Sequence, residues 1–212
     1  MTERELAEHP LTSELAACGN LFHQWQWSLS SSSNYSALLD SESVIISRSG
    51  VDKQYMKSSD FMLVDFNSKA KPPFEAMRPS AETELHCHLY RIAAKQPHPI
   101  KAVLHTHSKF AVYFSRRCLA SGAIVFTGFE MQKIFEGVST HESSVEIPVF
   151  RNSQHMPDIT RALDVHQEKN SFPPAYLIEG HGMYAWGKTV LHAKQKLEAL
   201  EYLLELKYME EK

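Results

Sequence analysis

Val103-Leu104-His105-Thr106-His107-Ser108 is the stretch around which the chain is organised. It is an apolar run that ends in two histidines one residue apart, as a buried strand would. Side chains at i and i+2 of a strand point to the same face, about 6–7 Å apart at the backbone. The spacing therefore predicts that His105 and His107 converge on one metal ion, with bonds of about 2.0–2.1 Å. The alternative is a pair of surface histidines at a strand end.

A third histidine has the same setting. Residues 176–182 read Tyr-Leu-Ile-Glu-Gly-His-Gly, another apolar run that ends in a histidine, His181. Three histidines with one open position are typical of a catalytic zinc site rather than a structural one. Imidazole ligands suit zinc, iron, cobalt or manganese better than an iron–sulfur cluster. We therefore expect a metal centre built from His105, His107 and His181.

The composition is that of an ordinary globular protein, except for its twelve histidines. The 212 residues are 43% hydrophobic and 22% charged, which suits a single domain, residues 1–212. A net charge of −3 gives no reason to expect nucleic acid or an anionic membrane as partner. No run approaches the ~18 apolar residues of a membrane span. The charged N-terminus and three cysteines without CxxC spacing indicate a cytoplasmic protein with reduced thiols; no role follows for Cys18, Cys87 or Cys118.

Apolar spacing predicts a mixture of short strands and helices, hence an α/β or α+β class. The expected helices cover residues 11–25, 79–94, 109–119, 159–166 and 189–209. The expected strands, besides the one before His105, cover residues 44–46, 61–66, 123–126, 145–150, 176–178 and 183–187. Ser80 is the expected cap of the second helix.

Two features suit an anion. The serine-rich residues 28–36 are either a flexible linker or a loop that surrounds a phosphate with backbone N–H groups and hydroxyls. The free N–H groups expected near Ser80 favour negative charge as well. Either feature alone is weak evidence for a phosphate site.

These pieces, in this order, resemble the class II aldolase/adducin-head family over residues 11–209. The motifs that carry the resemblance are residues 33–36, 48–50, 79–82, 105–107 and 180–182. Within the family, three further stretches look like the methylthioribulose-1-phosphate dehydratases of methionine salvage. They are residues 129–133 (Phe-Glu-Met-Gln-Lys), 152–154 (Asn-Ser-Gln) and 184–187 (Tyr-Ala-Trp-Gly).

The resemblance implies a three-layer α/β/α fold with a mainly antiparallel central sheet. It also implies a homotetramer with sites near subunit interfaces and a sugar-phosphate substrate. By the same resemblance, each subunit holds one Zn²⁺ through the three histidines already named, and Glu130 is the catalytic acid/base. The implied phosphate pocket consists of Ser31, Asn34, Ser49, Gly50 and Ser80.

Three positions depart from the family pattern. Ser33 stands where a loop glycine is usual, so we expect a backbone without positive φ there. His155 replaces an aspartate found in many dehydratases, and no role follows for it. Glu82 stands where some dehydratases carry cysteine and the aldolases a catalytic glutamate. A sugar-phosphate aldolase or epimerase therefore stays open, as does a non-catalytic binding module like the adducin heads.

For the dehydratase, the implied reaction removes the C3 proton and the C4 hydroxyl of 5-methylthioribulose 1-phosphate. Hydroxide is a poor leaving group, so Glu130 is expected to protonate it, which typically contributes 10²–10⁴-fold to the rate. Zinc would act as the Lewis acid. Glu130, Glu82 or a metal-bound water is the candidate base. The sequence decides neither the base, nor the native metal, nor the number of subunits.

Overall fold

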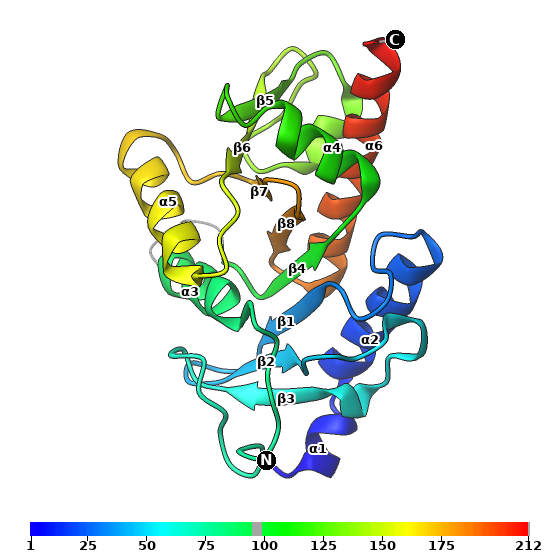
Figure 1. Ribbon diagram of the computed structural model, residues 1–212, viewed down its shortest axis with the longest axis vertical. Helices are drawn as coiled ribbons and strands as arrows, with labels where there is room; N and C mark the ends of the chain where they lie inside the picture. The colour runs from blue at the N-terminus through cyan, green and yellow to red at the C-terminus, as the bar shows by residue number, and fades with distance from the viewer. Residues whose placement is uncertain (95–98, 212) are drawn as a thin grey trace.

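An eight-stranded sheet forms the middle of the molecule (Figure 1). The structure is a computed structural model and describes residues 1–94 and 99–211. The strands are β1 (Asn34–Leu38), β2 (Val44–Ser47), β3 (Phe61–Val64), β4 (Ala102–Thr106), β5 (Ala123–Phe126), β6 (Val145–Phe150), β7 (Ala175–Ile178) and β8 (Gly182–Gly187). Their spatial order is β3-β2-β1-β4-β8-β7-β6-β5, and every neighbouring pair is antiparallel except β6 with β7. The expected mainly antiparallel sheet is confirmed.

Helices cover both faces of this sheet and give the expected α/β/α layers. One face packs against α2 (Pro10–Gln24), α4 (Lys109–Arg117) and α6 (Val190–Glu210), and the other against α3 (Thr83–Ala93) and α5 (Met156–Lys169). The remaining elements are α1 (Glu3–Ala7) and the 3-10 turns η1 (Lys53–Tyr55), η2 (Ser58–Asp60) and η3 (Glu130–Ile134). None of the helices described has the length and apolar character to cross a membrane.

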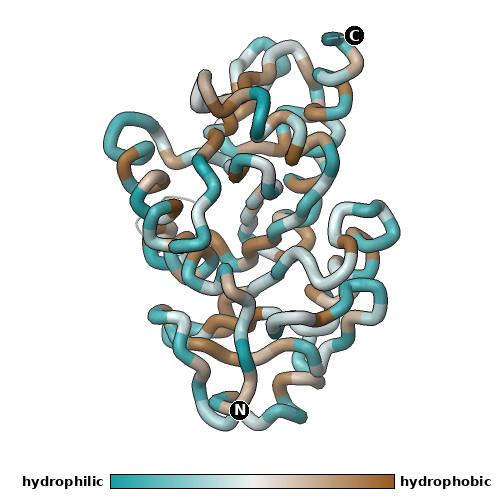
Figure 2. The backbone as a smooth tube through the Cα atoms, in the orientation of Figure 1, coloured by the Kyte–Doolittle hydropathy of each residue, from teal (hydrophilic) through white to brown (hydrophobic). Residues whose placement is uncertain are grey.

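β4 lies in the middle of the sheet, between β1 and β8. All five of its residues are buried. Successive side chains of a strand face opposite layers, so a strand covered on both sides needs a continuous apolar run. In Figure 2 hydrophobic (brown) stretches run through the middle of the molecule, and several of the outer loops are hydrophilic (teal). His105 is therefore held inside the molecule, on the face covered by α3.

The second expected helix starts later than its sequence indicates. α3 begins at Thr83, with Glu82 as its N-terminal flanking residue, rather than at Pro79 or Ser80. The reason is that Pro79 bridges to Arg48 and the Ser80 N–H donates to the Ser47 carbonyl at 3.2 Å. These bonds hold residues 79–80 in an extended conformation beside the end of β2. Ser80 instead accepts weakly from the Glu82 N–H, at 3.4 Å.

The serine-rich segment before β1 corrects another expectation. Ser33 has φ +71°, in the left-handed region, although no positive φ was expected there. This conformation costs a non-glycine residue about 1–3 kcal/mol and persists only where the surroundings enforce it. Ser28 provides that constraint: its hydroxyl donates to Ser33 Oγ at 2.9 Å and contacts the Tyr35 hydroxyl at 2.7 Å. The segment is thus a hydrogen-bonded turn, not a flexible linker.

A buried contact ties α4 to α6 directly after the two histidines of the opening motif. Ser108 is the N-cap of α4, and its hydroxyl donates to the Glu201 carboxylate on α6. Both residues are buried. Burial raises the pKa of Glu201 to about 7, from an ordinary value of 4.5. The folded protein therefore favours the protonated carboxyl group.

We predict that Glu201→Gln makes the stability of the protein less dependent on pH. Between about pH 4.5 and 7 the folded state keeps a proton that the unfolded state has lost, so wild-type stability falls as pH rises. The loss can reach about 3 kcal/mol, from roughly 1.4 kcal/mol per pH unit. Urea unfolding from pH 5 to pH 8 measures it, and the variant should show a much flatter profile. An equal decline in both proteins would contradict the prediction.

Candidate metal centre

Four side chains converge at one end of β4. Glu82, His105, His107 and His181 each offer a ligand atom, and these atoms all lie within 4.8 Å of one another. The Nε2 atoms of His105 and His107 are 2.8 Å apart. Glu82 Oε2 is 3.4 Å from His105 Nε2, and its Oε1 is 3.2 Å from His181 Nε2. The structure thus brings the three predicted histidines together and adds a carboxylate to them.

Two turns deliver the histidines to this point. β4 ends at Thr106, so His107 lies just beyond the strand rather than within it, and its N–H donates to the Trp27 carbonyl at 2.7 Å. His181 lies in the tight turn between β7 and β8, after Gly180 with φ +61°. β8 then approaches β4 so closely that a Cβ on Gly182 would lie 2.1 Å from the Thr106 carbonyl oxygen. Only glycine permits this approach.

The orientation of His105 is set by the backbone. Its Nδ1 lies 2.9 Å from the Met183 carbonyl, which can only accept, so Nδ1 carries the proton and Nε2 is bare. Burial lowers the pKa of His105 well below its ordinary value and that of His107 to about 4. Both rings are therefore neutral near pH 7. A carbonyl that fixes the tautomer of an imidazole in this way is a recurring feature of metal-binding histidines.

Glu82 is held by Tyr184, a residue to which the sequence analysis assigned no role. The Tyr184 hydroxyl donates to Glu82 Oε2, and its ring stacks on His105 with centroids 4.1 Å apart. Burial alone would raise the pKa of Glu82. The neighbouring histidines and the Tyr184 hydrogen bond outweigh burial and lower it, so the carboxyl group is ionised. The alternation of β8, which places Tyr184 on the face of His105, was the signal available in the sequence.

This donor set suits a divalent cation. Neutral imidazoles and one carboxylate are common ligands of zinc and other transition metals. The bare Nε2 of His105 lies 2.8 Å from His107 Nε2, a separation that needs either a proton on His107 Nε2 or a cation between the two nitrogens. His181 Nδ1 is buried without a hydrogen-bond partner among the described residues. The three cysteines lie outside this group and are free thiols.

The residues expected to bind phosphate lie partly beside this centre. Asn34 pairs with His105 in the register of β1 and β4, and Ser80 is two residues from Glu82. The Ser49 N–H donates to the Arg78 carbonyl at 2.9 Å, and the next residue, Gly50, has φ +78°. Ser31 is exposed in the turn before β1. No hydrogen bond joins Ser31 to the other four within the described part of the chain.

Glu130 lies outside the metal centre. It is the first residue of η3, and its side chain is 70% exposed. Its carboxylate is 2.6 Å from Lys133 Nζ and 3.2 Å from His141 Nδ1. The Lys133 hydrogen bond lowers the pKa of Glu130. Within one copy of the chain, therefore, the expected acid/base and the cluster of ligands are not joined. His155 is also exposed, 3.2 Å from Asp158.

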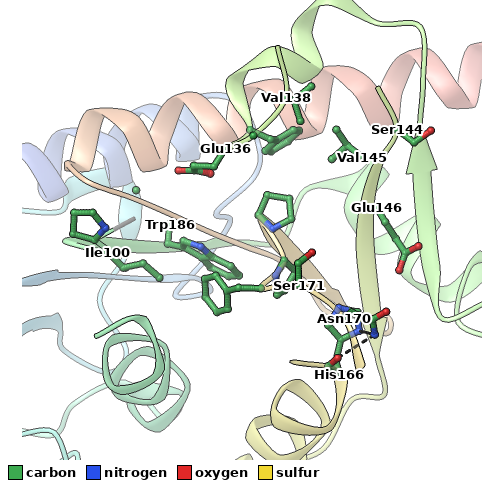
Figure 3. Close-up of a pocket in the computed structure, with 17 residues that line it drawn as sticks. Ile100, Glu136, Val138, Ser144, Val145, Glu146, His166, Asn170, Ser171 and Trp186 are labelled. Carbon is green, nitrogen blue, oxygen red and sulfur yellow. Dashed lines mark hydrogen bonds between the residues drawn. The ribbon is translucent and has the colours of Figure 1, made fainter. Parts of the chain in front are cut away.

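Two cavities differ in their relation to the metal centre. One of about 650 Å³ opens beside His107, and its wall on α4 carries three basic side chains, Lys109, Arg116 and Arg117. Another, of about 490 Å³, is drawn in Figure 3, where Trp186, Ile100 and Val138 line it. None of the four metal-centre residues borders this second cavity. Of the two, it is the cavity on α4 that borders the candidate centre.

We predict that His107→Ala abolishes stoichiometric metal binding. The variant lacks a ligand, so its metal affinity should fall by more than the roughly 10–100-fold that outer hydrogen-bond partners cost. His155→Ala is the matched control, because His155 is an exposed histidine away from the centre. Metal analysis after dialysis against a weak chelator measures both. A fully loaded His107→Ala protein would refute the assignment.

Comparison with known proteins identifies the family of the chain. The family model of the class II aldolase and adducin N-terminal domain matches residues 13–208. A methylthioribulose-1-phosphate dehydratase of Xanthomonas campestris pv. campestris (strain 8004) is 44% identical over 178 residues, which are 84% of this chain and 79% of that protein. The Sorangium cellulosum (strain So ce56) protein of the same name is 38% identical over 203 residues, 94% of this chain and 92% of its own length.

Solved structures share the fold at low sequence identity. The L-fuculose-1-phosphate aldolase from Thermus thermophilus superposes with a TM-score of 0.72 and 18% identity, covering 93% of this chain and 92% of that one. A sugar-phosphate aldolase from Thermotoga maritima gives a TM-score of 0.60 and 15% identity, with 96% and 93% coverage. The family match spans nearly the whole sequence, and the chain therefore belongs to the class II aldolase and adducin N-terminal domain family.

Proposed function

We propose that the protein dehydrates 5-methylthioribulose 1-phosphate to 2,3-diketo-5-methylthiopentyl 1-phosphate. The observation that carries the proposal is the convergence of three histidines and Glu82 within 4.8 Å. It occurs in a chain 38–44% identical to proteins named methylthioribulose-1-phosphate dehydratase. A non-catalytic module would have no need of a buried, charged donor set, because burying such groups is costly.

The centre would hold one divalent cation per subunit, and we propose zinc. When bound, the cation supplies Lewis-acid polarisation of the substrate's C2 carbonyl, worth several kcal/mol. The chain contributes the preorganisation: Met183 fixes the ring of His105, and Tyr184 fixes Glu82. The low pKa of Glu82 suits an anionic ligand better than a base, because an efficient base has a pKa near the working pH.

The phosphate group is proposed to lie beside the centre, against Ser31, Asn34, Ser49, Gly50 and Ser80. Hydroxyls, the amide of Asn34 and the backbone at the Gly50 turn offer donors without a fixed charge. Lys109, Arg116 and Arg117 line the cavity beside His107. Such a positive rim raises the local concentration of an anionic substrate and its rate of association.

Glu130 is proposed to move the proton. As a carboxylate it can first accept the proton that leaves C3. It then returns this proton to the C4 hydroxyl, which departs as water. The resulting enol becomes the 2,3-diketone by tautomerisation. The exposure of Glu130, away from the ligands of its own chain, supports the further proposal that it acts at the centre of a neighbouring copy in a homotetramer.

We predict that Glu130→Gln loses activity by about 10²–10⁴-fold while its metal content stays at the wild-type level. Glu142→Gln is the matched control, since Glu142 is an exposed glutamate of the same connection. Initial rates with the authentic substrate and metal analysis give the two readouts. Near-wild-type turnover of Glu130→Gln would remove this residue from the mechanism.

Coassembly tests whether Glu130 acts across a subunit boundary. Glu130→Gln and His107→Ala subunits are each inactive alone, but a mixed oligomer joins an intact Glu130 to an intact centre. Coexpression with two different tags should therefore restore a measurable fraction of the wild-type rate. Mixed oligomers that remain inactive would place both groups in one subunit.

One observation supports a second candidate activity, that of a sugar-phosphate aldolase or epimerase. Glu82 occupies the position of the catalytic glutamate of the aldolases, and it lies at the metal centre. A retro-aldol enzyme or an epimerase would use the same residues on a ketose phosphate. We expect methylthioribulose 1-phosphate to give the diketone, with activity lost on chelation and regained with Zn²⁺. Aldehyde release from fuculose 1-phosphate, without diketone formation, would favour the aldolase. A cytoplasmic location and a single domain over residues 1–212 remain predictions.

A further inference from the structure

A chain of buried hydrogen bonds leads away from the candidate anion pocket. Asn34 Oδ1 is 2.5 Å from His86 Nε2, and His86 Nδ1 is 2.7 Å from Ser36 Oγ. Ser36 Oγ is in turn 2.8 Å from the Tyr90 hydroxyl. Asn34 and Ser36 are on the same face of β1, and His86 and Tyr90 are one turn apart on α3. We call these four residues the relay.

The relay is closed to solvent. Ser36 and His86 are 0% exposed, and Asn34 and Tyr90 are 4% exposed. Burial lowers the pKa of His86 to about 4, so the ring is neutral and carries a single N–H. The side chain is enclosed because α3 packs this side of the helix on the sheet. The side-chain protons of Ser36, His86 and Tyr90 must therefore be donated within it, since an unsatisfied buried donor costs about 1–3 kcal/mol.

This requirement sets the direction of the bonds. Ser36 is the hydrogen-bond partner of the Tyr90 hydroxyl, so Tyr90 must donate to Ser36 Oγ. Ser36 then donates to His86 Nδ1, and the single proton of His86 is on Nε2, facing Asn34 Oδ1. Burial raises the pKa of Tyr90, so the phenol keeps its proton and has to donate it. The reverse direction would leave the Tyr90 proton without an acceptor.

We propose that His86 is a positioning residue that turns the Asn34 amide so that its NH₂ group faces the anion pocket. Asn34 Nδ2 makes no hydrogen bond within the described part of the chain, and it is not among the fully buried unpartnered atoms. The two N–H groups of Asn34 Nδ2 are therefore available to donate to a bound anion. The opposite tautomer of His86 would present the amide oxygen and repel a phosphate. The relay thereby selects for an anion, and this inference rests on the proposed phosphate pocket.

The tautomer of His86 is directly measurable. Histidine-selective ¹⁵N labelling, with His86→Gln used to assign the resonances, distinguishes a protonated Nε2 from a protonated Nδ1. We expect a neutral His86 with its proton on Nε2 in the metal-loaded enzyme. A proton on Nδ1 would overturn the inference whatever the enzyme's activity proves to be.

Phosphate binding tests the consequence. Inorganic phosphate is titrated into the metal-loaded protein, and we expect His86→Leu to weaken its binding about tenfold or more. His86→Gln keeps an N–H donor near the position of Nε2, so it should recover most of the affinity. His88→Gln is the matched control, because His88 is on the same helix but lies 2.9 Å from Asp164, outside the relay. In turnover, His86→Leu should raise KM with a smaller change in kcat.

The outcomes separate the inference from the function. Unchanged phosphate affinity in a folded, metal-loaded His86→Leu protein would overturn the inference, as would a His86→Gln protein as weak as His86→Leu. Equal weakening in His88→Gln would indicate a general effect of α3 and would also overturn it. Wild-type protein that binds phosphate as described but fails to dehydrate methylthioribulose 1-phosphate would overturn the proposed function alone.

Discussion

The close antiparallel pairing of β4 with β8 is the constraint on which the candidate site depends. Gly182 lies against the Thr106 carbonyl, at a distance that leaves no room for a Cβ. This contact brings the turn that carries His181 next to the end of β4. The same pair of strands places the Met183 carbonyl against His105 Nδ1 and stacks Tyr184 on its ring. One strand pairing thus both assembles the imidazoles and sets their orientation.

α3 connects this centre to the anion pocket. Glu82 precedes its first turn, and His86 and Tyr90 follow at intervals of four residues, so all three lie along the edge that faces the sheet. Glu82 joins the histidines; in the proposed relay His86 orients Asn34 directly, and Tyr90 acts on His86 through Ser36. A helix packed on a sheet is rigid, so both sets of donors keep their positions without a ligand. Preorganisation of this kind lowers the cost of binding a charged substrate.

The metal centre and Glu130 differ in their surroundings and in their chemistry. The centre combines the neutral imidazoles of His105 and His107 with the ionised carboxylate of Glu82, whose negative charge a divalent cation would offset. Glu130, by contrast, lies in solvent on a connection between β5 and β6, with Lys133 and His141 around it. In the proposed mechanism Glu130 acts at the centre of a second copy of the chain, which would couple catalysis to assembly.

The sequence by itself determined the elements with strong local patterns, and the three-layer fold followed from the family resemblance. The apolar runs before His105 and His181 are strands, and the long helix over residues 189–209 is α6. Local sequence patterns do not predict contacts between residues that are distant in the sequence. The late start of α3, the left-handed Ser33, the carboxylate of Glu82 beside the histidines and the burial of His86 were decided by tertiary packing. Periodicity reports which face of an element is apolar, whereas a hydrogen bond or a shared ligand site depends on which other element covers that face.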